Sequence, residues 1–298
     1  MNPEKAKLGS GLYLVATPIG TARDITLRAL DILRDADVIA AEDTRSLRRL
    51  LEIHAVPLDG REMLAYHDHN GARARPRIMA ALAAGKSVVY ASEAGTPMVA
   101  DPGFDLVRAV VEAGYPLISA PGPSAVITAL TVAGLPTDRF FFAGFLPPAA
   151  SKRKTALREL AAVPGTLVFY ESPKRVAAML ADAAEVLGPV RQAALCRELT
   201  KKFEEVLRAP LGDLATISAG RSFKGEIVVL VEKGDSESIR EFDLDRALRV
   251  ALNGSTVRDA ADRVAAASGL KRRMVYQRAL ELENKAEPAE GDGQRSGE

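Results

Sequence analysis

The sequence predicts an α/β protein with two α/β domains, largely parallel sheets and a small helical domain toward the C-terminal end. Three observations carry this prediction. Short β-rich runs alternate with helical stretches from Leu12 to about Val231, which is typical of parallel sheets covered by helices. Loops rich in glycine, proline and other small residues follow several of these runs. After Lys233 the alternation stops and only helical patterns remain.

The strands and helices are expected in a regular succession. Apolar runs predict strands at 12–17, 38–41, 63–66, 87–91, 117–120, 140–145, 166–170, 193–197 and 227–231. Apolar residues at helical spacing predict helices between them, at 26–34, 74–84, 104–113, 124–132, 154–162 and 173–187. Asn70 and Ser124 stand where N-caps are expected, and glycines follow three of the predicted helix ends.

Three more helices are expected near the end of the chain, at 244–252, 256–267 and 271–282. Ser255 and Thr256 can cap the second, and a turn with glycine before the third gives a helix-turn-helix outline. The polar segment 234–241 indicates a linker, and Pro121-Gly122-Pro123 marks an earlier break. We therefore expect domains at 1–121, 122–235 and 243–285, and a disordered acidic tail at 286–298.

Composition excludes several classes of protein. The 298 residues include 40 basic and 39 acidic side chains but only one cysteine. No apolar run approaches the about 20 residues of a membrane helix, and the polar first residues do not resemble a signal peptide. Cys196 alone cannot form an intrachain disulfide, and we expect it in the core. These features predict a cytoplasmic protein without a membrane partner.

Three loops at expected strand ends are candidates for binding a small molecule. They span 16–20, 92–103 and 121–125, and they consist mainly of glycine, proline, alanine, serine and threonine. Such residues let a ligand approach the backbone, and ligands of parallel sheets collect at the carboxyl ends of the strands. Each loop alone could be only a tight turn. Neither a phosphate-binding P-loop nor a GxGxxG fingerprint is present.

Several segments together resemble a known family. They are LYLVATPIG (12–20), SEAGTPMVADPG (92–103), PGPSA (121–125), FLP (145–147), FYESP (169–173), RELTK (197–201) and KGE (224–226). In this order they are similar to the ribosomal RNA small subunit methyltransferase I family of the tetrapyrrole-methylase-like superfamily. Glu93 is a departure, because the family's loop is expected to carry aspartate there.

The resemblance implies a fold, a cofactor and a reaction. It implies two α/β domains with S-adenosylmethionine (SAM) in the cleft between them. It also implies 2′-O-methylation of a cytidine in the decoding region of 16S rRNA, on an assembled small ribosomal subunit, by a homodimer. By resemblance, the SAM-binding residues are Pro18, Gly95, Thr96, Pro97, Val99, Ser124 and Ala125. Phe169 is a candidate for the adenine side, and a core aromatic is the alternative.

The reaction needs a base for the ribose hydroxyl or a cation for the alkoxide. Glu171, Arg197, Glu198 and Lys201 follow expected strands and are the catalytic candidates. Glu171 or Glu198 could be the base, and Lys201 or Arg197 could polarise the oxygen or hold phosphate; surface salt bridges are the alternative for each. Glu226 is a further candidate for the cleft. The segment His67-Asp68-His69-Asn70 lacks a visible third ligand, so no metal is expected.

Basic residues are clustered although the net charge is only +1. We expect an RNA path along Arg45, Arg48, Arg49, Lys152, Arg153, Lys271, Arg272 and Arg273. A solvated surface is the alternative for each cluster. Two other functions are kept open: a small-molecule or protein methyltransferase of the same superfamily, acting on a corrin precursor or diphthine, and a non-catalytic nucleic-acid-binding protein.

Overall fold

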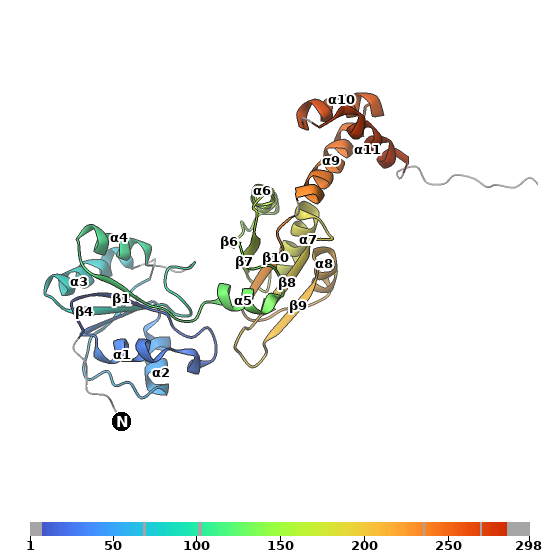
Figure 1. Ribbon diagram of the computed structural model, residues 1–298. Helices are drawn as coiled ribbons and strands as arrows, with labels where there is room; N and C mark the ends of the chain where they lie inside the picture. Colours follow the sequence, from blue (N-terminus) through green and yellow to red (C-terminus); the bar gives the residue numbers. More distant parts are fainter. Residues whose placement is uncertain (1–7, 68–69, 101–102, 235, 269, 285–298) are drawn as a thin grey trace, which may run out of the picture.

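The described residues form two five-stranded sheets followed by three helices (Figure 1). The computed structural model describes residues 8–67, 70–100, 103–234, 236–268 and 270–284. The first sheet lies in the first half of the chain and the second sheet in the second half. Two α/β units and a C-terminal helical unit were predicted, and this architecture is confirmed. The boundaries given for the domains remain predictions.

The first sheet is entirely parallel, with the strand order β3-β2-β4-β1-β5. Its strands are β1 (Gly11–Val15), β2 (Val38–Ala41), β3 (Met63–Ala65), β4 (Ser87–Ala91) and β5 (Leu117–Ala120). Most are buried along their whole length, as expected where helices cover both faces of a parallel sheet. Their carboxyl ends meet at one edge, and the small-residue loops begin there.

Helices cover both faces of the first sheet (Figure 1). One face packs against α1 (Leu27–Asp35) and α2 (Thr44–Ile53). The other packs against α3 (Gly71–Ala83) and α4 (Phe104–Glu112), and a short 3₁₀ turn, η1 (Ala22–Asp24), precedes α1. Asn70 occupies the N-cap position of α3, but its side chain makes no capping hydrogen bond to the helix. The Oδ1 atom of Asn70 accepts instead from the His67 backbone N–H at 2.9 Å.

The second sheet is mixed, so the prediction of largely parallel sheets is wrong for this half. Its order is β6-β7-β10-β8-β9, and only the β6–β7 pair is parallel. The strands are β6 (Phe140–Phe145), β7 (Thr166–Glu171), β8 (Gln192–Arg197), β9 (Glu205–Pro210) and β10 (Ile227–Val231). Strand β9 was not predicted. Because no helix separates β8 from β9, the two strands form an antiparallel hairpin.

The two faces of the second sheet have different partners. Helices α6 (Ala150–Leu160), α7 (Val176–Leu187) and α8 (Leu211–Ala219) cover one face; α8 was not predicted. The other face packs against α5 (Ala125–Ala133), which lies between the two sheets (Figure 1). Ile19 and Val99 from the first half join this second core. One face of the second sheet is therefore directed toward the first half of the chain. It carries Val168 of β7, Cys196 of β8 and Val228 of β10. The buried position of Cys196 is confirmed.

The C-terminal helices form a small core of their own. They are α9 (Ser236–Leu252), α10 (Val257–Ser268) and α11 (Arg272–Asn284), and they pack through residues such as Leu248, Ala261 and Val275. The linker expected at 234–241 is wrong in part, because α9 already begins at Ser236. The cap predicted at Thr256 is confirmed: its Oγ1 accepts from the Asp259 backbone N–H at 3.2 Å. The expected acidic tail lies outside the described residues.

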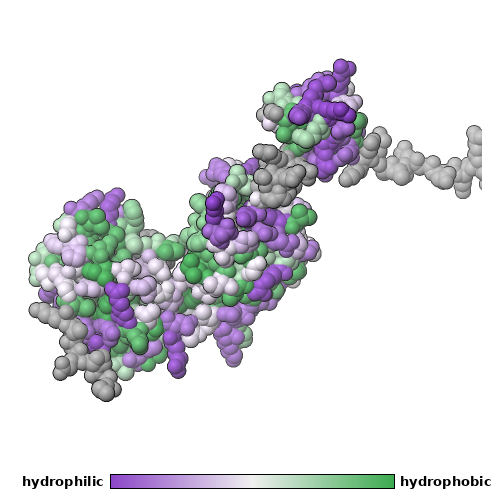
Figure 2. All heavy atoms as spheres, viewed as in Figure 1, coloured by the Kyte–Doolittle hydropathy of each residue, from purple (hydrophilic) through white to green (hydrophobic). Residues whose placement is uncertain are grey.

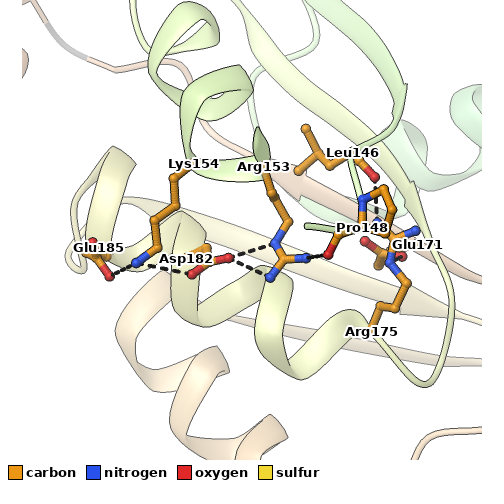
Figure 3. Close-up of polar contacts among 8 residues, drawn as sticks. All are labelled: Leu146, Pro148, Arg153, Lys154, Glu171, Arg175, Asp182 and Glu185. Atoms are coloured by element: carbon orange, nitrogen blue, oxygen red, sulfur yellow. Dashed lines mark hydrogen bonds and ion pairs between the residues drawn. The ribbon is translucent and has the colours of Figure 1, made fainter. Parts of the chain in front are cut away.

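A buried polar cluster joins α6 to α7 (Figure 3). Arg153 is only 5% exposed, and its guanidinium contacts Asp182 Oδ2 at 2.6–2.7 Å. It also donates to the Pro148 carbonyl at 2.9 Å. The prediction that Arg153 contacts RNA is therefore wrong, because the side chain is turned inward as a structural ion pair. Its neighbour Lys152 is exposed.

We predict that Arg153→Ala lowers the free energy of unfolding by about 3 kcal/mol, because it leaves a buried carboxylate with weaker compensation. Lys152→Ala, one residue away and exposed, should change it by less than about 0.5 kcal/mol. Urea unfolding followed by circular dichroism measures both. A loss below about 1 kcal/mol in the Arg153 variant would show that the pair contributes little to stability.

Candidate active site

Three small-residue loops meet at the carboxyl edge of the first sheet. Thr17 and Gly95 exchange backbone hydrogen bonds of 3.0 Å in both directions. The Thr96 hydroxyl donates to the Pro123 carbonyl at 2.9 Å. The loops predicted after β1, β4 and β5 are therefore tied to one another directly. They form one continuous surface rather than three separate turns.

A small cavity of about 50 Å³ lies on this surface. Its lining includes five of the residues assigned to SAM, together with three others: Gly95, Thr96, Val99, Ser124 and Ala125, with Ile19, Ala94 and Tyr170. Pro18 and Pro97 belong to the same loops but do not line this cavity. Gly95 has a φ of +81°, a left-handed conformation that favours glycine. The cavity accommodates part of a drug-sized ligand, since whole sites measure about 300–1,000 Å³.

Tyr170, rather than Phe169, lines this cavity. Phe169 is fully buried in the core between the second sheet and α6–α8, so its assignment to the adenine side is wrong. Successive side chains of a strand point to opposite faces, and Tyr170 therefore lies on the face toward the first half, with Val168. Its ring packs edge-on against Phe142 and Phe145. The sequence motif identified the correct strand, but the residue that lines the cavity is Tyr170, one position after the predicted Phe169.

A cluster of three charged side chains forms where the β8–β9 hairpin meets the start of β10. The Lys201 ammonium lies 2.9 Å from Glu198 Oε1 and 2.8 Å from Glu226 Oε2. Glu198 Oε1 also accepts from the Glu226 backbone N–H at 3.0 Å. The Glu198 backbone N–H donates to the Glu226 carbonyl at 2.9 Å. Two predicted catalytic candidates, Glu198 and Lys201, are thus brought together, and Glu226 joins them.

The charges of this cluster stabilise one another. Burial alone raises the pKa of the Glu198 carboxyl, but the hydrogen bonds from Lys201 and the Glu226 backbone reverse the effect and lower it. Burial likewise lowers the pKa of the Lys201 ammonium, and its bonds to Glu226 and Glu198 raise it overall. Both groups are therefore charged at neutral pH. Lys201 can act as a fixed cation but not as a base.

This cluster is attached to the first half of the chain. The Thr21 backbone N–H donates to Thr200 Oγ1 at 3.1 Å, and the Thr21 hydroxyl donates to the Thr200 carbonyl. A Cβ added at Gly20 would lie 2.5 Å from Lys201 Cγ and 2.6 Å from Thr200 Oγ1. The two loops thus approach so closely that only glycine fits at position 20 without displacement. The charged cluster therefore lies beside the loop that follows β1.

Acidic residues of the first half extend the charged region. The Glu93 backbone N–H donates to Glu42 Oε2 at 3.0 Å. The pKa of the Glu93 carboxyl is raised by burial and then by the negative charges of Glu42, Asp43 and Glu226. Position 93, where the sequence departs from the expected aspartate, is thus close enough to Glu226 for the charge of that carboxylate to affect Glu93. Sequence reasoning missed Glu42, although its place directly after β2 was the available signal.

The other two catalytic candidates, Glu171 and Arg197, form ion pairs outside this cluster. The Glu171 side chain is buried on the face covered by α6–α8 and pairs with Arg175 at 3.2 Å (Figure 3). Its prediction as a base in the cleft is wrong, because its place in β7 turns it away from Tyr170. Arg197 pairs with Glu205 at 3.1 Å and donates to the Lys224 carbonyl at 3.4 Å. Arg197 thus links the ends of β8 and β9 to the segment before β10, and its charge helps to lower the pKa of Glu198.

The remaining basic residues predicted for RNA lie on the surface. Arg48, Arg49, Lys152, Lys271 and Arg273 are exposed. Arg45 is exposed and pairs with Asp43 at 3.0 Å, whereas Arg272 pairs with Asp262. Figure 2 shows hydrophilic residues over much of the C-terminal helices. Of the eight basic residues predicted to contact RNA, all but the buried Arg153 therefore lie where a polyanion can reach them.

Neither a metal site nor a membrane-spanning helix is found among the described residues. They contain no group of three or more His, Cys, Asp or Glu side chains placed to hold a metal ion. Asp68 and His69 lie outside them. Among the same residues, no helix combines the length and apolar character needed to cross a bilayer.

Two family models match the chain. The model of the Tetrapyrrole (Corrin/Porphyrin) Methylases matches residues 11–215, and that of the RsmI C-terminal HTH domain matches residues 241–283. Curated relatives match over nearly the whole length. Ribosomal RNA small subunit methyltransferase I of Mesorhizobium japonicum is 46% identical, with 96% of each chain covered. The protein of the same name from Escherichia coli O157:H7 is 42% identical, over 91% of this chain and 94% of its own.

Solved structures share the fold at low sequence identity. Uroporphyrin-III C-methyl transferase from Thermus thermophilus, complexed with S-adenyl homocysteine, has a TM-score of 0.52 and 22% identity, covering 74% of this chain and 96% of its own. A diphthine synthase has a TM-score of 0.58 and 17% identity, covering 78% and 95%. The match over residues 11–215 and the 42–46% identity of the curated relatives establish the relationship. The chain belongs to the tetrapyrrole methylase family, in the branch of the ribosomal RNA small subunit methyltransferase I proteins.

Proposed function

We propose that this protein transfers a methyl group from SAM to the 2′-hydroxyl of a cytidine in the decoding region of 16S rRNA, within the small ribosomal subunit. The names of its curated relatives support an rRNA of the small subunit as substrate. One observation carries the chemistry. A fixed cation held by two carboxylates lies beside the joined small-residue loops, as a hydroxyl nucleophile requires.

The joined loops and Tyr170 would hold the methyl donor. Gly95, Thr96, Ser124 and Ala125 offer backbone that a ligand can approach closely, and Tyr170 offers an aromatic wall. This lining fits part of an amphipathic nucleoside donor. When bound, SAM supplies an electrophilic methyl carbon with a neutral thioether as leaving group. Pro18, Pro97 and Val99 complete the proposed binding loops.

The charged cluster would activate the ribose hydroxyl. Lys201 is held in place by Glu198 and Glu226, so its ammonium can stabilise an oxyanion without first reorganising. Glu226 is the more exposed of the two carboxylates, whereas Glu198 Oε1 is already bonded twice. We assign the hydroxyl proton to Glu226. Lys201 would stabilise the resulting ribose oxyanion, and bound SAM would supply the methyl carbon that the oxyanion takes, with the thioether as leaving group.

The direct test of this function is methyl transfer to small subunits. Small subunits from cells that lack the gene should accept labelled methyl from SAM, and mass spectrometry should place it on one cytidine ribose. If SAM binds but neither free rRNA nor subunits accept label, the function is wrong. Transfer to a porphyrinoid or to a protein would instead favour the other branches of the family.

The C-terminal helices favour RNA over a small molecule. The branch-specific helical domain at 241–283 is matched by its own model. Its exposed Lys271 and Arg273 give it cationic groups. The homodimer and the cytoplasmic location expected from the sequence remain predictions.

Tyr170 and Phe169 lie next to each other on opposite faces of β7, so substituting each of them tests which face binds the methyl donor. Tyr170→Ala should weaken SAM binding about tenfold, the loss of one aromatic contact. Phe169→Leu should leave the dissociation constant within about twofold and instead lower the free energy of unfolding by about 1–2 kcal/mol. Calorimetric titration and urea unfolding measure the two effects. The opposite pattern would place the donor on the other face of β7.

Lys201→Ala should lower kcat for methyl transfer by about 10²–10³-fold, the usual effect of removing one oxyanion-stabilising donor. SAM binding should change by less than about threefold, because Lys201 does not line the donor cavity. Lys233→Ala removes a surface lysine elsewhere and serves as the control. A Lys201 variant with kcat within threefold of wild type would exclude this role.

A further inference from the structure

An exposed aromatic ring stands on the β8–β9 loop next to the charged cluster. Phe203 is 63% exposed, and the Lys202 ammonium lies 5.5 Å from the centre of its ring. An aromatic side chain left in water forgoes the large gain of burial. A ring paired with a cation at the edge of a proposed RNA site has the composition of a base-stacking surface.

Hydrogen bonds within the loop fix the backbone on either side of Phe203. The Thr200 N–H donates to Glu204 Oε2 at 2.5 Å, and the Glu204 N–H donates to the Lys201 carbonyl at 3.1 Å. Glu198 and Thr200 adopt left-handed backbone, with φ of +52° and +63°. Such conformations are costly for residues other than glycine and persist only when the surroundings enforce them. The backbone of the β8–β9 loop is therefore preorganised rather than flexible, and the loop with Phe203 on it is called the platform below.

The location of the platform relates it to the reaction. Phe203 follows Lys201 by two residues, and the same loop is bonded to Thr21 of the first half. The exposed ring is thus two residues from the proposed catalytic lysine, on the loop that an RNA strand delivering a ribose to Lys201 has to approach. Lys201 is already paired with Glu198 and Glu226, whereas the Lys202 ammonium lies beside the exposed ring and is the cation placed to meet a phosphate.

We propose that Phe203 stacks on a base of the substrate RNA strand and that Lys202 neutralises an adjoining phosphate. This inference rests on the proposed function and adds a substrate-positioning residue to it. The bases that stack on protein aromatics are those of single-stranded or splayed-out RNA. The strand entering the site is therefore unpaired at the nucleotide that meets Phe203.

The absence of tryptophan from the chain makes the stacking directly observable. Phe203→Trp introduces a single tryptophan whose emission should fall saturably when small subunits lacking the methyl group, or a cytidine-containing single-stranded RNA, are added. Phe140→Trp is the matched control. Phe140 is 44% exposed and pairs with Thr166, at the end of the second sheet opposite to Tyr170. Equal quenching in both variants, or none at position 203, overturns the proposal.

Kinetics supply the second readout. Phe203→Ala should raise KM for the RNA substrate roughly tenfold or more, as expected for losing one base stack. SAM affinity should stay within twofold, and Phe203→Tyr should restore KM. If the wild-type enzyme methylates the RNA and the KM of Phe203→Ala for that RNA is within twofold of the wild-type value, the stacking inference alone fails. If wild-type enzyme does not methylate any RNA, the proposed function fails, and the tryptophan signal still reports whether RNA meets the loop.

Discussion

The contact between the β8–β9 loop and the loop after β1 sets the geometry of the whole site. It consists of two hydrogen bonds between Thr21 and Thr200, together with the close approach at Gly20. Each half has its own core, and Ile19 and Val99 of the first half also pack into the core on the inner face of the second sheet. Through this contact the donor loops of the first half and the charged cluster of the second become parts of one site.

Beside that contact, Glu198 connects two segments of the second half. Its carboxylate bonds both the Lys201 ammonium and the Glu226 backbone, so the hairpin loop and the start of β10 share one anchor. Gly225 lies against this carboxylate: its φ of +85° favours glycine, and an added Cβ would displace the Glu198 side chain. Reactive groups at strand ends thus depend on glycines that give them space. Lys201 gains a fixed position and a raised pKa from the same bonds.

The first sheet and its loops could be predicted from the sequence, whereas parts of the second sheet and of the candidate site could not. The parallel first sheet and its loops follow from buried apolar runs ending in small residues, and both were predicted. The second sheet was mispredicted because β9 is half-exposed and follows β8 without a helix. Phe169 and Tyr170 differ only in strand phase, which the motif does not reveal. The burial of Arg153 and Glu171 depends on partners distant in sequence, Asp182 and the strands beside β7.

The most direct test of the central contact is the methylation rate of Gly20→Ala. The added Cβ would meet Thr200 Oγ1 and Lys201 Cγ, and it must push the loop that carries Lys201 away. We expect kcat to fall at least about tenfold, because a misplacement of about 1 Å can cost 10²-fold. Thermal stability and SAM affinity should stay near wild type. An unchanged kcat in a folded Gly20→Ala protein would contradict the claim that this contact positions the catalytic lysine.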